Sequence, residues 1–304
     1  MSPPADSLPK RARARLRSCL RETENMVQRR WRRALVAASR DWTSTTSNRS
    51  SLVLAAHPDD ETFGCGATIA RKAHGGASVR VLIATDGRNA NPSSRALTPE
   101  QLGAVRRHEA IEACEILGVP SDHVVQPALP HLRCAEAVER VRGLLAELID
   151  EYAPDEILVN TALDYHPDHK ILNRIARQLV AETRYRGTLA EYPVWYLFDG
   201  PWSPDRAALA GRPTIDETPQ AARGPLSRLL YRVAEPVLSV ARLHPVRVAS
   251  GPFLDPKRRA VMAHRSQVTN FTGEEDWGFL GPEFVNVFLT RYELFFPVPG
   301  EHSI

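Results

Sequence analysis

The sequence predicts an α/β fold, a mostly parallel sheet with helices on both faces, preceded by a basic N-terminal helix. Short runs of apolar and β-branched residues, which are typical of strands buried on both faces, alternate with longer amphipathic segments. Turn-forming Gly, Pro and Asp residues separate these runs, and strands that alternate with helices in this way form parallel sheets. The composition, 43% hydrophobic and 25% charged residues in 304, agrees with a globular chain that buries a sizeable core.

Each predicted element has a local reason in the sequence. The apolar run at residues 51–56 ends in turn residues, which indicates a buried strand. A helix is expected to start after Thr98, because Pro99 at the first helical position and Gln101 two residues later complete a capping box. Apolar residues recur at helical spacing over residues 135–151. In chain order, we expect strands at residues 51–56, 79–85, 124–129, 156–159 and 191–198, and helices at 66–74, 98–117, 135–151 and 170–183.

The N-terminal segment and one internal segment interrupt this alternation. Residues 1–40 contain eleven Lys and Arg residues against three acidic ones, and residues 9–41 are expected to be helical. Residues 43–50 are all polar and predict a linker. Beyond residue 198, we expect a loop at 199–224, helices at 225–243 and 256–265, and strands at 285–288 and 292–296. The predicted organisation is a basic N-terminal extension over residues 1–50 and one domain over 51–304, with a variable insertion at about 199–254.

Two clusters of histidine and acidic residues follow predicted strands. Residues 57–61 read His-Pro-Asp-Asp-Glu and come directly after the strand at 51–56. Residues 164–169 read Asp-Tyr-His-Pro-Asp-His and follow the strand at 156–159. Parallel strands end at one edge of a sheet, where open α/β sheets place their active sites. The two clusters therefore predict a metal-dependent enzyme.

The clusters contain donors for one hydrolytic metal ion. His57 and Asp60 lie three residues apart on a predicted tight turn, so both side chains can reach the same ion. Zinc in hydrolytic sites takes three protein ligands and keeps one open position, and either His166 or His169 can supply the third ligand. Zinc held in this way polarises a carbonyl and lowers the pKa of water toward ~7.

Other side chains in the clusters fit roles in proton transfer. Asp59 or Glu61 can accept the proton of an attacking water. The histidine of the second cluster that does not bind the metal, His166 or His169, can protonate a leaving group or stabilise an oxyanion. The sequence therefore contains the groups that metal-assisted hydrolysis of an amide or ester requires.

Several classes of protein are disfavoured. The four cysteines are scattered without Cys-x-x-Cys spacing, which argues against a disulfide framework and a thiolate zinc site. The sequence shows no signal-peptide pattern and no apolar run near the ~18 residues that span a bilayer, so we expect a cytoplasmic protein. An NAD-binding site is disfavoured because Gly64-Cys65-Gly66 follows the acidic cluster and Ile69 stands where the third glycine belongs.

A non-catalytic α/β module that keeps metal only for structure is a further alternative. Structural zinc sites are usually closed, with four ligands, and rich in thiolates. This sequence offers His and Asp ligands with spare carboxylates, which favours catalysis.

The same residues resemble the motifs of the PIG-L (LmbE-like) zinc-dependent N-acetylglucosaminyl deacetylases. Residues 56–61 and 63–70 are similar to the first family motif, with Gly66-Ala67 in place of the usual Gly-Gly, and residues 166–169 are similar to the second. Residues 106–110 resemble the Arg-x-x-Glu-Ala helix of the family, and residues 264–267 resemble a His-x-Ser-Gln block. The resemblance covers roughly residues 51–198 and 255–290.

The resemblance implies a Rossmann-like fold with Zn²⁺, or another divalent metal, at the strand ends. In this interpretation Asp59 is the general base, His166 the electrophile or general acid, and Asp168 the partner that tunes a histidine. The implied metal ligands are His57, Asp60 and His169, the implied catalytic residues are Asp59, His166 and Asp168, and the substrate-binding candidates are Arg106, Glu109 and His264.

The resemblance also implies a class of substrate. The family mostly removes N-acetyl groups from glucosamine-containing molecules, so we expect a hydrolase acting on a linear amide C–N bond of a glycoconjugate or glycolipid. An alternative is an amidase acting on an inositol-linked thiol conjugate. The expected partner is a small-molecule or lipid-linked amino sugar, and the sequence leaves the oligomeric state open.

The segments outside the resemblance suggest a second hypothesis about partners. Residues 9–41 are basic, and residues 225–243 are amphipathic with three arginines, so peripheral contact with an anionic membrane is a hypothesis for this cytoplasmic protein. Nucleic acid is not expected as a partner, because the N-terminal segment has few aromatic residues on which bases could stack.

Overall fold

A single sheet is the centre of the fold. The computed structural model describes residues 25–183, 185–201 and 236–299. In this part of the chain the strands are β1 (Arg40–Asp41), β2 (Ser51–Ala55), β3 (Val79–Ile83), β4 (Val124–Val125), β5 (Glu156–Asn160), β6 (Thr188–Tyr192), β7 (Val246–Ala249) and β8 (Tyr292–Pro297). They form one sheet in the order β1-β7-β8-β6-β5-β2-β3-β4. Strands β2 to β6 are parallel, and β8 runs antiparallel to both of its neighbours, β6 and β7.

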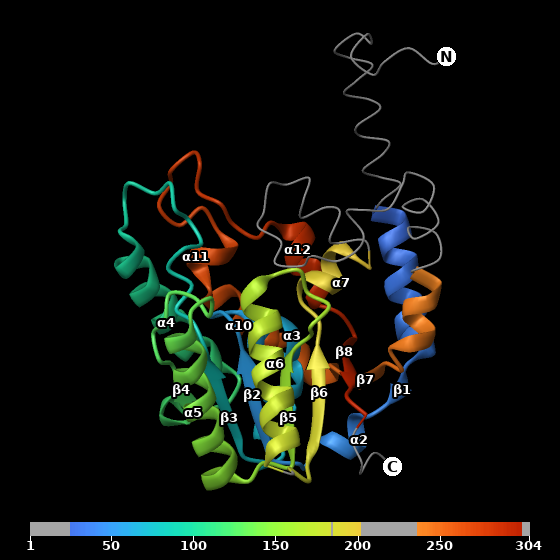
Figure 1. Cartoon of the computed structure of the whole chain (residues 1–304). Coiled ribbons are helices and arrows are strands. Elements are labelled where there is room, and N and C mark those ends of the chain that lie inside the picture. Colours follow the sequence, from blue (N-terminus) through green and yellow to red (C-terminus); the bar gives the residue numbers. More distant parts are fainter. Residues whose placement is uncertain (1–24, 184, 202–235, 300–304) are drawn as a thin grey trace, which may run out of the picture.

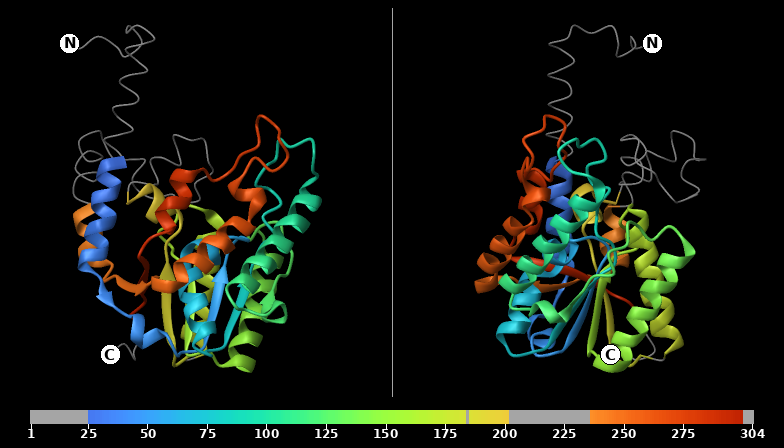
Figure 2. Two further views of the ribbon diagram at one scale, coloured as in Figure 1. Left: turned by 180° about the vertical axis from the view of Figure 1, so that it is seen from behind. Right: turned by 90° about the vertical axis from the view of Figure 1, so that its left-hand side faces the viewer.

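Helices cover both faces of this sheet, as Figures 1 and 2 show. They are α2 (Thr43–Thr46), α3 (Asp60–His74), α4 (Pro99–Ile116), α5 (Ala135–Tyr152), α6 (Pro167–Glu182), α7 (Trp195–Asp199), α10 (Leu254–Ala263), α11 (Arg265–Val268) and α12 (Pro282–Phe288), with short 3₁₀ turns at Ser121–His123 and Gly251–Phe253. The predicted α/β architecture, a mostly parallel sheet with helices on both faces, is confirmed.

A hydrophobic core lies between each face of the sheet and the helices that cover it. Side chains alternate along β2, so Val53 and Ala55 face one core while Leu52 and Leu54 face the other. Residues of α3, α4 and α10 fill the first core, and residues of α5 and α6 fill the second. All five residues of β2 are buried, as expected for a central parallel strand.

The order of the strands positions the site. From β2 the chain builds outward through β3 and β4, and then returns to place β5 on the other side of β2. In open α/β sheets, ligands bind in the crevice outside the carboxyl ends of the strands where the order reverses in this way. The crevice here lies between the ends of β2 and β5, and both His/Asp clusters follow these two strands.

Most of the predicted elements agree with the structure, and one start is well off. Helix α4 begins with the predicted capping box at Thr98, and β8 confirms the predicted strand at 292–296. Helix α3 starts at Asp60, six residues before the predicted start at residue 66, because residues 60–65 continue directly from the turn into the helix. The first His/Asp cluster, residues 57–61, therefore lies partly in the first turn of a helix.

Four predictions were wrong in part or in full. The strand predicted at 124–129 ends at Val125, because Pro127 cannot donate to the sheet and Ala128 has a positive φ of 59°. The strand predicted at 191–198 ends at Tyr192, because Pro193 cannot donate to the sheet, and α7 follows. The strand predicted at 285–288 is helix α12, which starts with Pro282 at its first position after Gly281. The polar linker predicted at 43–50 contains α2, whose Thr46 is fully buried.

The segment before residue 50 packs on the sheet. Residues 25–38 are helical, and the rest of the predicted basic helix before residue 25 lies outside the described residues. Trp31 and Leu35 are buried in the first core, and β1 pairs with β7. The domain boundary at residue 50 stays a prediction, and these contacts argue against it.

The internal insertion is described only at its ends. Residues 202–235 lie outside the described part. Most of the predicted loop at 199–224 and the first half of the predicted helix at 225–243 are therefore not described. Residues 236–242 are helical, and β7 enters the sheet. The membrane hypothesis depends largely on segments that are not described. Among the described helices, none is both long and apolar enough to cross a bilayer.

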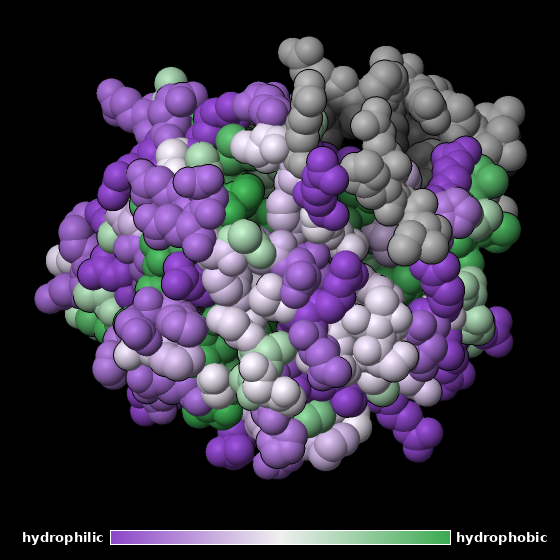
Figure 3. All heavy atoms as spheres, turned by 90° about the horizontal axis from the view of Figure 1, so that it is seen from below, coloured by the Kyte–Doolittle hydropathy of each residue, from purple (hydrophilic) through white to green (hydrophobic). Residues whose placement is uncertain are grey.

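The face of the molecule at the amino ends of the parallel strands is mostly polar. Figure 3 views this face, and hydrophilic residues dominate its described surface, with hydrophobic residues in small separate areas. The two His/Asp clusters follow the carboxyl ends of β2 and β5, at the opposite edge of the sheet.

Candidate metal centre

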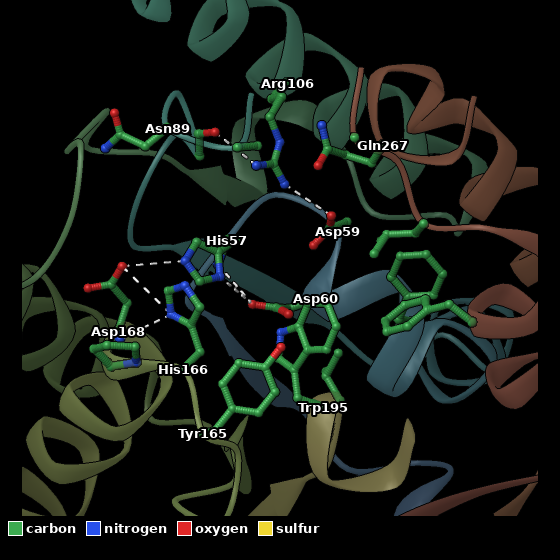
Figure 4. A pocket seen from close by; sticks show the side chains of 18 of the residues that line it. His57, Asp59, Asp60, Asn89, Arg106, Tyr165, His166, Asp168, Trp195 and Gln267 are labelled. Atoms are coloured by element: carbon green, nitrogen blue, oxygen red, sulfur yellow. Dashed lines mark hydrogen bonds and ion pairs between the residues drawn. The ribbon is translucent and has the colours of Figure 1, made fainter. Parts of the chain in front are cut away.

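Three predicted ligands meet at the carboxyl ends of β2 and β5. His57 Nδ1 lies 3.1 Å from His169 Nε2 and 3.3 Å from Asp60 Oδ2. His169 Nε2 lies 3.2 Å from the same Asp60 oxygen. The three donor atoms therefore form a nearly equilateral triangle, drawn in part in Figure 4. Donors that surround a zinc ion tetrahedrally at its usual bond lengths are about 3.3 Å apart, so the triangle has the size that a divalent ion requires.

The other nitrogen of each histidine has a carboxylate partner. His169 Nδ1 lies 2.7 Å from Asp164 Oδ2, and His57 Nε2 lies 3.4 Å from Asp168 Oδ2. Each carboxylate favours a proton on the nitrogen that faces it, which leaves the lone pair of the other nitrogen directed into the triangle. With the Asp60 oxygen, three lone pairs converge on one point. This donor set fits a divalent cation.

The local charges also favour a cation at this point. Burial lowers the pKa of His169, but the carboxylates of Asp60 and Asp164 outweigh it and raise that pKa to about 10. Burial raises the pKa of Asp60, but His169 and His57 outweigh it and hold that pKa well below its usual range. A proton and a metal ion would therefore compete for the same position, and metal binding here would release protons.

His166 lies beside the triangle without belonging to it. Nitrogen atoms of His57, His166 and His169 lie within 4.8 Å of one another, so an all-histidine ligand set is the alternative. We favour Asp60 as the third ligand, because its distances to the other two are shorter. His166 begins α6, and its Nδ1 accepts a hydrogen bond from the amide of Asp168 at 3.3 Å. Burial, followed by the two neighbouring histidines, lowers the pKa of His166 well below its usual value.

Asp59 lies next to the triangle in an unusual backbone conformation. Its φ of 130° is a costly conformation for a residue with a side chain, and such outliers cluster at functional sites. Asp59 precedes α3, yet its side chain does not cap that helix. Its Oδ2 instead accepts a hydrogen bond from Arg106 Nη2 at 3.0 Å. Burial raises the pKa of Asp59 to about 6, although Arg106 opposes this shift.

A cavity of about 500 Å³ opens onto these residues. Arg106, Asn89 and Gln267 contribute polar groups to its wall, and Figure 4 shows them across the cavity from Tyr165 and Trp195. The rest of the lining is largely apolar. It comprises Phe63, Ala90, Pro130, Pro167, Val194, Phe279, Leu280 and Phe284 together with Gly87, Gly278, Arg133 and the residues of the metal centre His57, Asp59, Asp60, His166 and Asp168.

The structure brings together most of the predicted site residues and separates two. His57, Asp59, Asp60, Arg106, His166 and Asp168 line the cavity, and fully buried His169 completes the triangle behind it. Glu109 and His264 are buried and do not line the cavity. Their contacts, with Ser266 in one case and with Glu61 and Thr62 in the other, do not favour the predicted substrate contact.

Two kinds of residue at the site were missed by sequence reasoning. Asp164 belongs to the second cluster but received no role, although a carboxylate near a ligating histidine commonly orients its ring. Trp195 comes from a segment that was predicted as a strand, and Phe284 lies just before another such segment. Nothing in the local pattern placed their rings at the cavity.

Comparison with known proteins agrees with the site. The family model described as PIG-L: GlcNAc-PI de-N-acetylase matches residues 52–180, which contain both clusters. The chain carries a PIG-L (LmbE-like) family domain. The matched segment begins in β2 and ends in α6, so this PIG-L domain includes the switch point of the sheet and every atom of the triangle.

Relatives of the PIG-L domain include proteins named 1D-myo-inositol 2-acetamido-2-deoxy-alpha-D-glucopyranoside deacetylase. One from Thermomonospora curvata is 33% identical over 163 residues, which are 45% of this chain and 54% of that protein. Another from Acidothermus cellulolyticus is 28% identical over 249 residues, 72% of this chain and 80% of that protein. The chain spans about half the length of the first relatives that it matches.

The fold of the PIG-L domain and its surroundings is also found in solved structures. The N,N'-diacetylchitobiose deacetylase from Pyrococcus horikoshii superposes with a TM-score of 0.54 at 20% identity, over 83% of this chain and 84% of that one. At this identity the likeness shows the fold.

Proposed function

We propose that the protein is a Zn²⁺-dependent hydrolase that removes an N-acetyl or other N-acyl group from a glucosamine-containing glycoconjugate or glycolipid. The observation that carries this proposal is the triangle of His57 Nδ1, Asp60 Oδ2 and His169 Nε2, with sides of 3.1 to 3.3 Å, at the wall of a cavity beside Asp59. Three protein ligands and one accessible side are the arrangement of hydrolytic rather than structural zinc.

His57, Asp60 and His169 would hold the metal. When bound there, Zn²⁺ supplies Lewis acidity, which polarises an amide carbonyl and makes water more acidic. The protein contributes the groups around it. Asp164 and Asp168 fix the two imidazole rings through their second nitrogens.

Asp59 is proposed as the general base. Its carboxylate lines the cavity, and its pKa of about 6 allows it to accept a proton from water near neutral pH. Arg106 holds one carboxylate oxygen and leaves the other for the water. After the carbonyl carbon has been attacked, Asp59 can pass the proton to the departing amine.

His166 is proposed as the electrophilic partner of the carbonyl oxygen. Its low pKa keeps the ring neutral, and the contact of Nδ1 with the amide of Asp168 leaves the proton on Nε2. Nε2–H can then donate to the oxygen on which negative charge develops.

The names of the relatives support this substrate class, and the size of the cavity agrees with it. The named relatives act on N-acetylglucosaminyl inositol, and the fold is shared with a diacetylchitobiose deacetylase. A cavity of about 500 Å³ accepts a sugar with an attached group. No observation favours an amidase acting on thiol conjugates or a non-catalytic module that retains metal.

The proposal is tested by measuring amine release from a panel of N-acetylglucosaminyl compounds, including the inositol glycoside and diacetylchitobiose, with and without a chelator. We expect release that stops with the chelator and returns with Zn²⁺. Asp59→Ala should keep the metal and lose at least about 100-fold in kcat, because a general base contributes that much. His57→Ala should lose both metal and activity, whereas Asp122→Ala, at an exposed carboxylate, should match the wild-type protein. Full activity in Asp59→Ala would exclude the general-base role.

A further inference from the structure

One peptide unit beside the metal centre is held at both of its ends by charged side chains. The carbonyl of Pro58 accepts a hydrogen bond from Arg106 Nη2 at 2.7 Å. The amide of Asp59, which belongs to the same peptide unit, donates to Glu61 Oε2 at 3.1 Å. The cation thus lies at the negative end of the peptide dipole and the anion at its positive end, so both contacts stabilise one orientation of this unit.

This orientation is the one that Asp59 needs for its unusual conformation. Its φ of 130° is disfavoured for any residue with a Cβ, and it persists only when surrounding contacts fix the backbone. The next peptide unit is fixed as well, because the carbonyl of Asp59 accepts hydrogen bonds from the amides of Thr62 and Phe63 in the first turn of α3. The result is a carboxylate that turns away from the helix and toward Arg106 and the cavity.

Glu61 is held in turn by a buried histidine from another part of the chain. His264 Nε2 lies 3.1 Å from Thr62 Oγ1 and 3.4 Å from Glu61 Oε1. The Thr62 hydroxyl donates to the same Glu61 oxygen at 2.7 Å. His264 and Glu61 are both fully buried, and His264 Nδ1 has no hydrogen-bond partner among the described residues. Among the described residues, the polar contacts of this imidazole are therefore all with Glu61 and Thr62.

The two sides of the arrangement are tied to each other. Glu109 lies one turn after Arg106 on α4, and its carboxylate accepts hydrogen bonds from both the amide and the hydroxyl of Ser266, at 2.9 and 2.6 Å. Ser266 lies two residues after His264. The Glu109–Ser266 contact thus fixes the segment that carries His264 to the helix that carries Arg106.

We propose that Arg106, Glu61 and His264 form a clamp on the Pro58–Asp59 peptide unit that aims the Asp59 carboxylate into the cavity. They are positioning residues, because they act on the reaction through Asp59. Glu61 and His264 do not touch the substrate. This inference deepens the proposed function, because it relies on the role of Asp59 as general base. It also gives a common purpose to Arg106, Glu109 and His264, which the sequence suggested as substrate contacts.

The test compares Glu61→Gln and His264→Ala with the wild-type protein. The control is His108→Ala, which changes an exposed histidine on α4, the helix that carries Arg106. Three quantities are measured: the φ of Asp59 and its distance to Arg106 in crystal structures, the Zn²⁺ affinity by titration, and the kcat and KM of deacetylation. For both clamp variants we expect φ of Asp59 to leave the positive region. We also expect a Zn²⁺ affinity within threefold of wild type and a kcat at least tenfold lower at an unchanged KM.

The outcomes separate the clamp from the proposed function. A φ of Asp59 that stays near 130° in Glu61→Gln and His264→Ala overturns the clamp, and so does a loss of kcat no larger than in His108→Ala. If His264→Ala does not fold, the nearly isosteric Glu61→Gln decides. A wild-type protein that releases no amine from any compound contradicts the proposed function, whereas the crystal structures and the Zn²⁺ titration still decide whether the clamp exists.

Discussion

The chemistry of the centre depends on which ring nitrogen of His169 carries the proton. Asp164 faces Nδ1, and its carboxylate also accepts hydrogen bonds from the backbone amides of Val194 and Tyr196. These amides fix the carboxylate, which in turn fixes the imidazole and leaves Nε2 free to bind an ion. A buried residue outside the triangle thus sets the protonation state of one of the proposed ligands.

Asp164→Asn is expected to weaken Zn²⁺ binding about 10- to 100-fold, the usual effect of losing the carboxylate partner of a ligating histidine. The asparagine oxygen can still accept from Tyr196, but its amide group then faces the Nδ1–H of His169 and disfavours the required tautomer. Competition with a chelating dye measures the affinity. The control is Glu182→Gln, the same change at an exposed carboxylate of α6. Equal affinities of the two variants would contradict this role of Asp164.

The site residues that the sequence could predict are those whose partners are close in sequence or whose strands end at one edge. His57 and Asp60 share one turn, and His169 follows the adjacent strand β5, so simple topology places them together. The positions of Glu109 and His264 could not be predicted, because their partners Ser266 and Glu61 lie 157 and 203 residues away in the chain. A spacing motif shows that such residues matter without showing what they touch.

At the scale of elements, the turn after β3 is coupled to the turn after β2 that carries Asp59. Gly87 has a φ of +64°, and its carbonyl accepts a hydrogen bond from Arg106 Nη1 at 2.9 Å. A Cβ at Gly87 would lie 2.0 Å from the same nitrogen. The guanidinium would have to move away, and it would then leave the carbonyl of Pro58 and the carboxylate of Asp59.

Gly87→Ala should therefore lower kcat strongly while it lowers the free energy of unfolding only moderately. The matched control is Gly76→Ala, since Gly76 also has a positive φ of +80° but has nothing within 4 Å of an added Cβ. A side chain at positive φ should cost each variant about 1 kcal/mol of unfolding free energy, measured by urea unfolding. Gly87→Ala should lose more than Gly76→Ala, because the buried Arg106 side chain gives up hydrogen bonds. Only Gly87→Ala should lower kcat, by tenfold or more. Similar kcat values for the two variants would show that Arg106 tolerates displacement.

The elements also show where local patterns are sufficient and where they are not. Strands β2 and β5 were predictable because they are short apolar runs between turn residues. Residues 285–288 have a similar apolar pattern but form part of α12, since the preceding Gly281-Pro282 starts a helix and Phe284 and Phe288 pack one turn apart. Short apolar runs fit strand and helix equally well, and their packing partners decide between the two.

For the whole molecule, the candidate metal centre and a buried ion pair that stabilises the fold lie at opposite edges of the sheet. The metal centre lies at the carboxyl ends of β2 and β5, and a buried ion pair lies at the amino end of β5. Lys72 Nζ is 2.8 Å from Glu156 Oε2, and both side chains are fully buried. Glu156 also accepts a hydrogen bond from Thr46, which ties the segment before the first central strand to the sheet. This pair holds α3 against β5 at the end far from the chemistry.

Lys72→Met should lower the free energy of unfolding by about 3–5 kcal/mol, because it leaves the Glu156 charge buried without its partner. Arg142→Met, which breaks a largely exposed pair with Glu182, should change it by less than about 1 kcal/mol. Urea unfolding measures both values. The kcat of the folded Lys72→Met protein should equal that of the wild type, because the pair lies at the opposite edge of the sheet from the triangle. A loss of kcat without a loss of stability would show that the two edges are coupled through α3, which begins at Asp60 and carries Lys72 in its last turn.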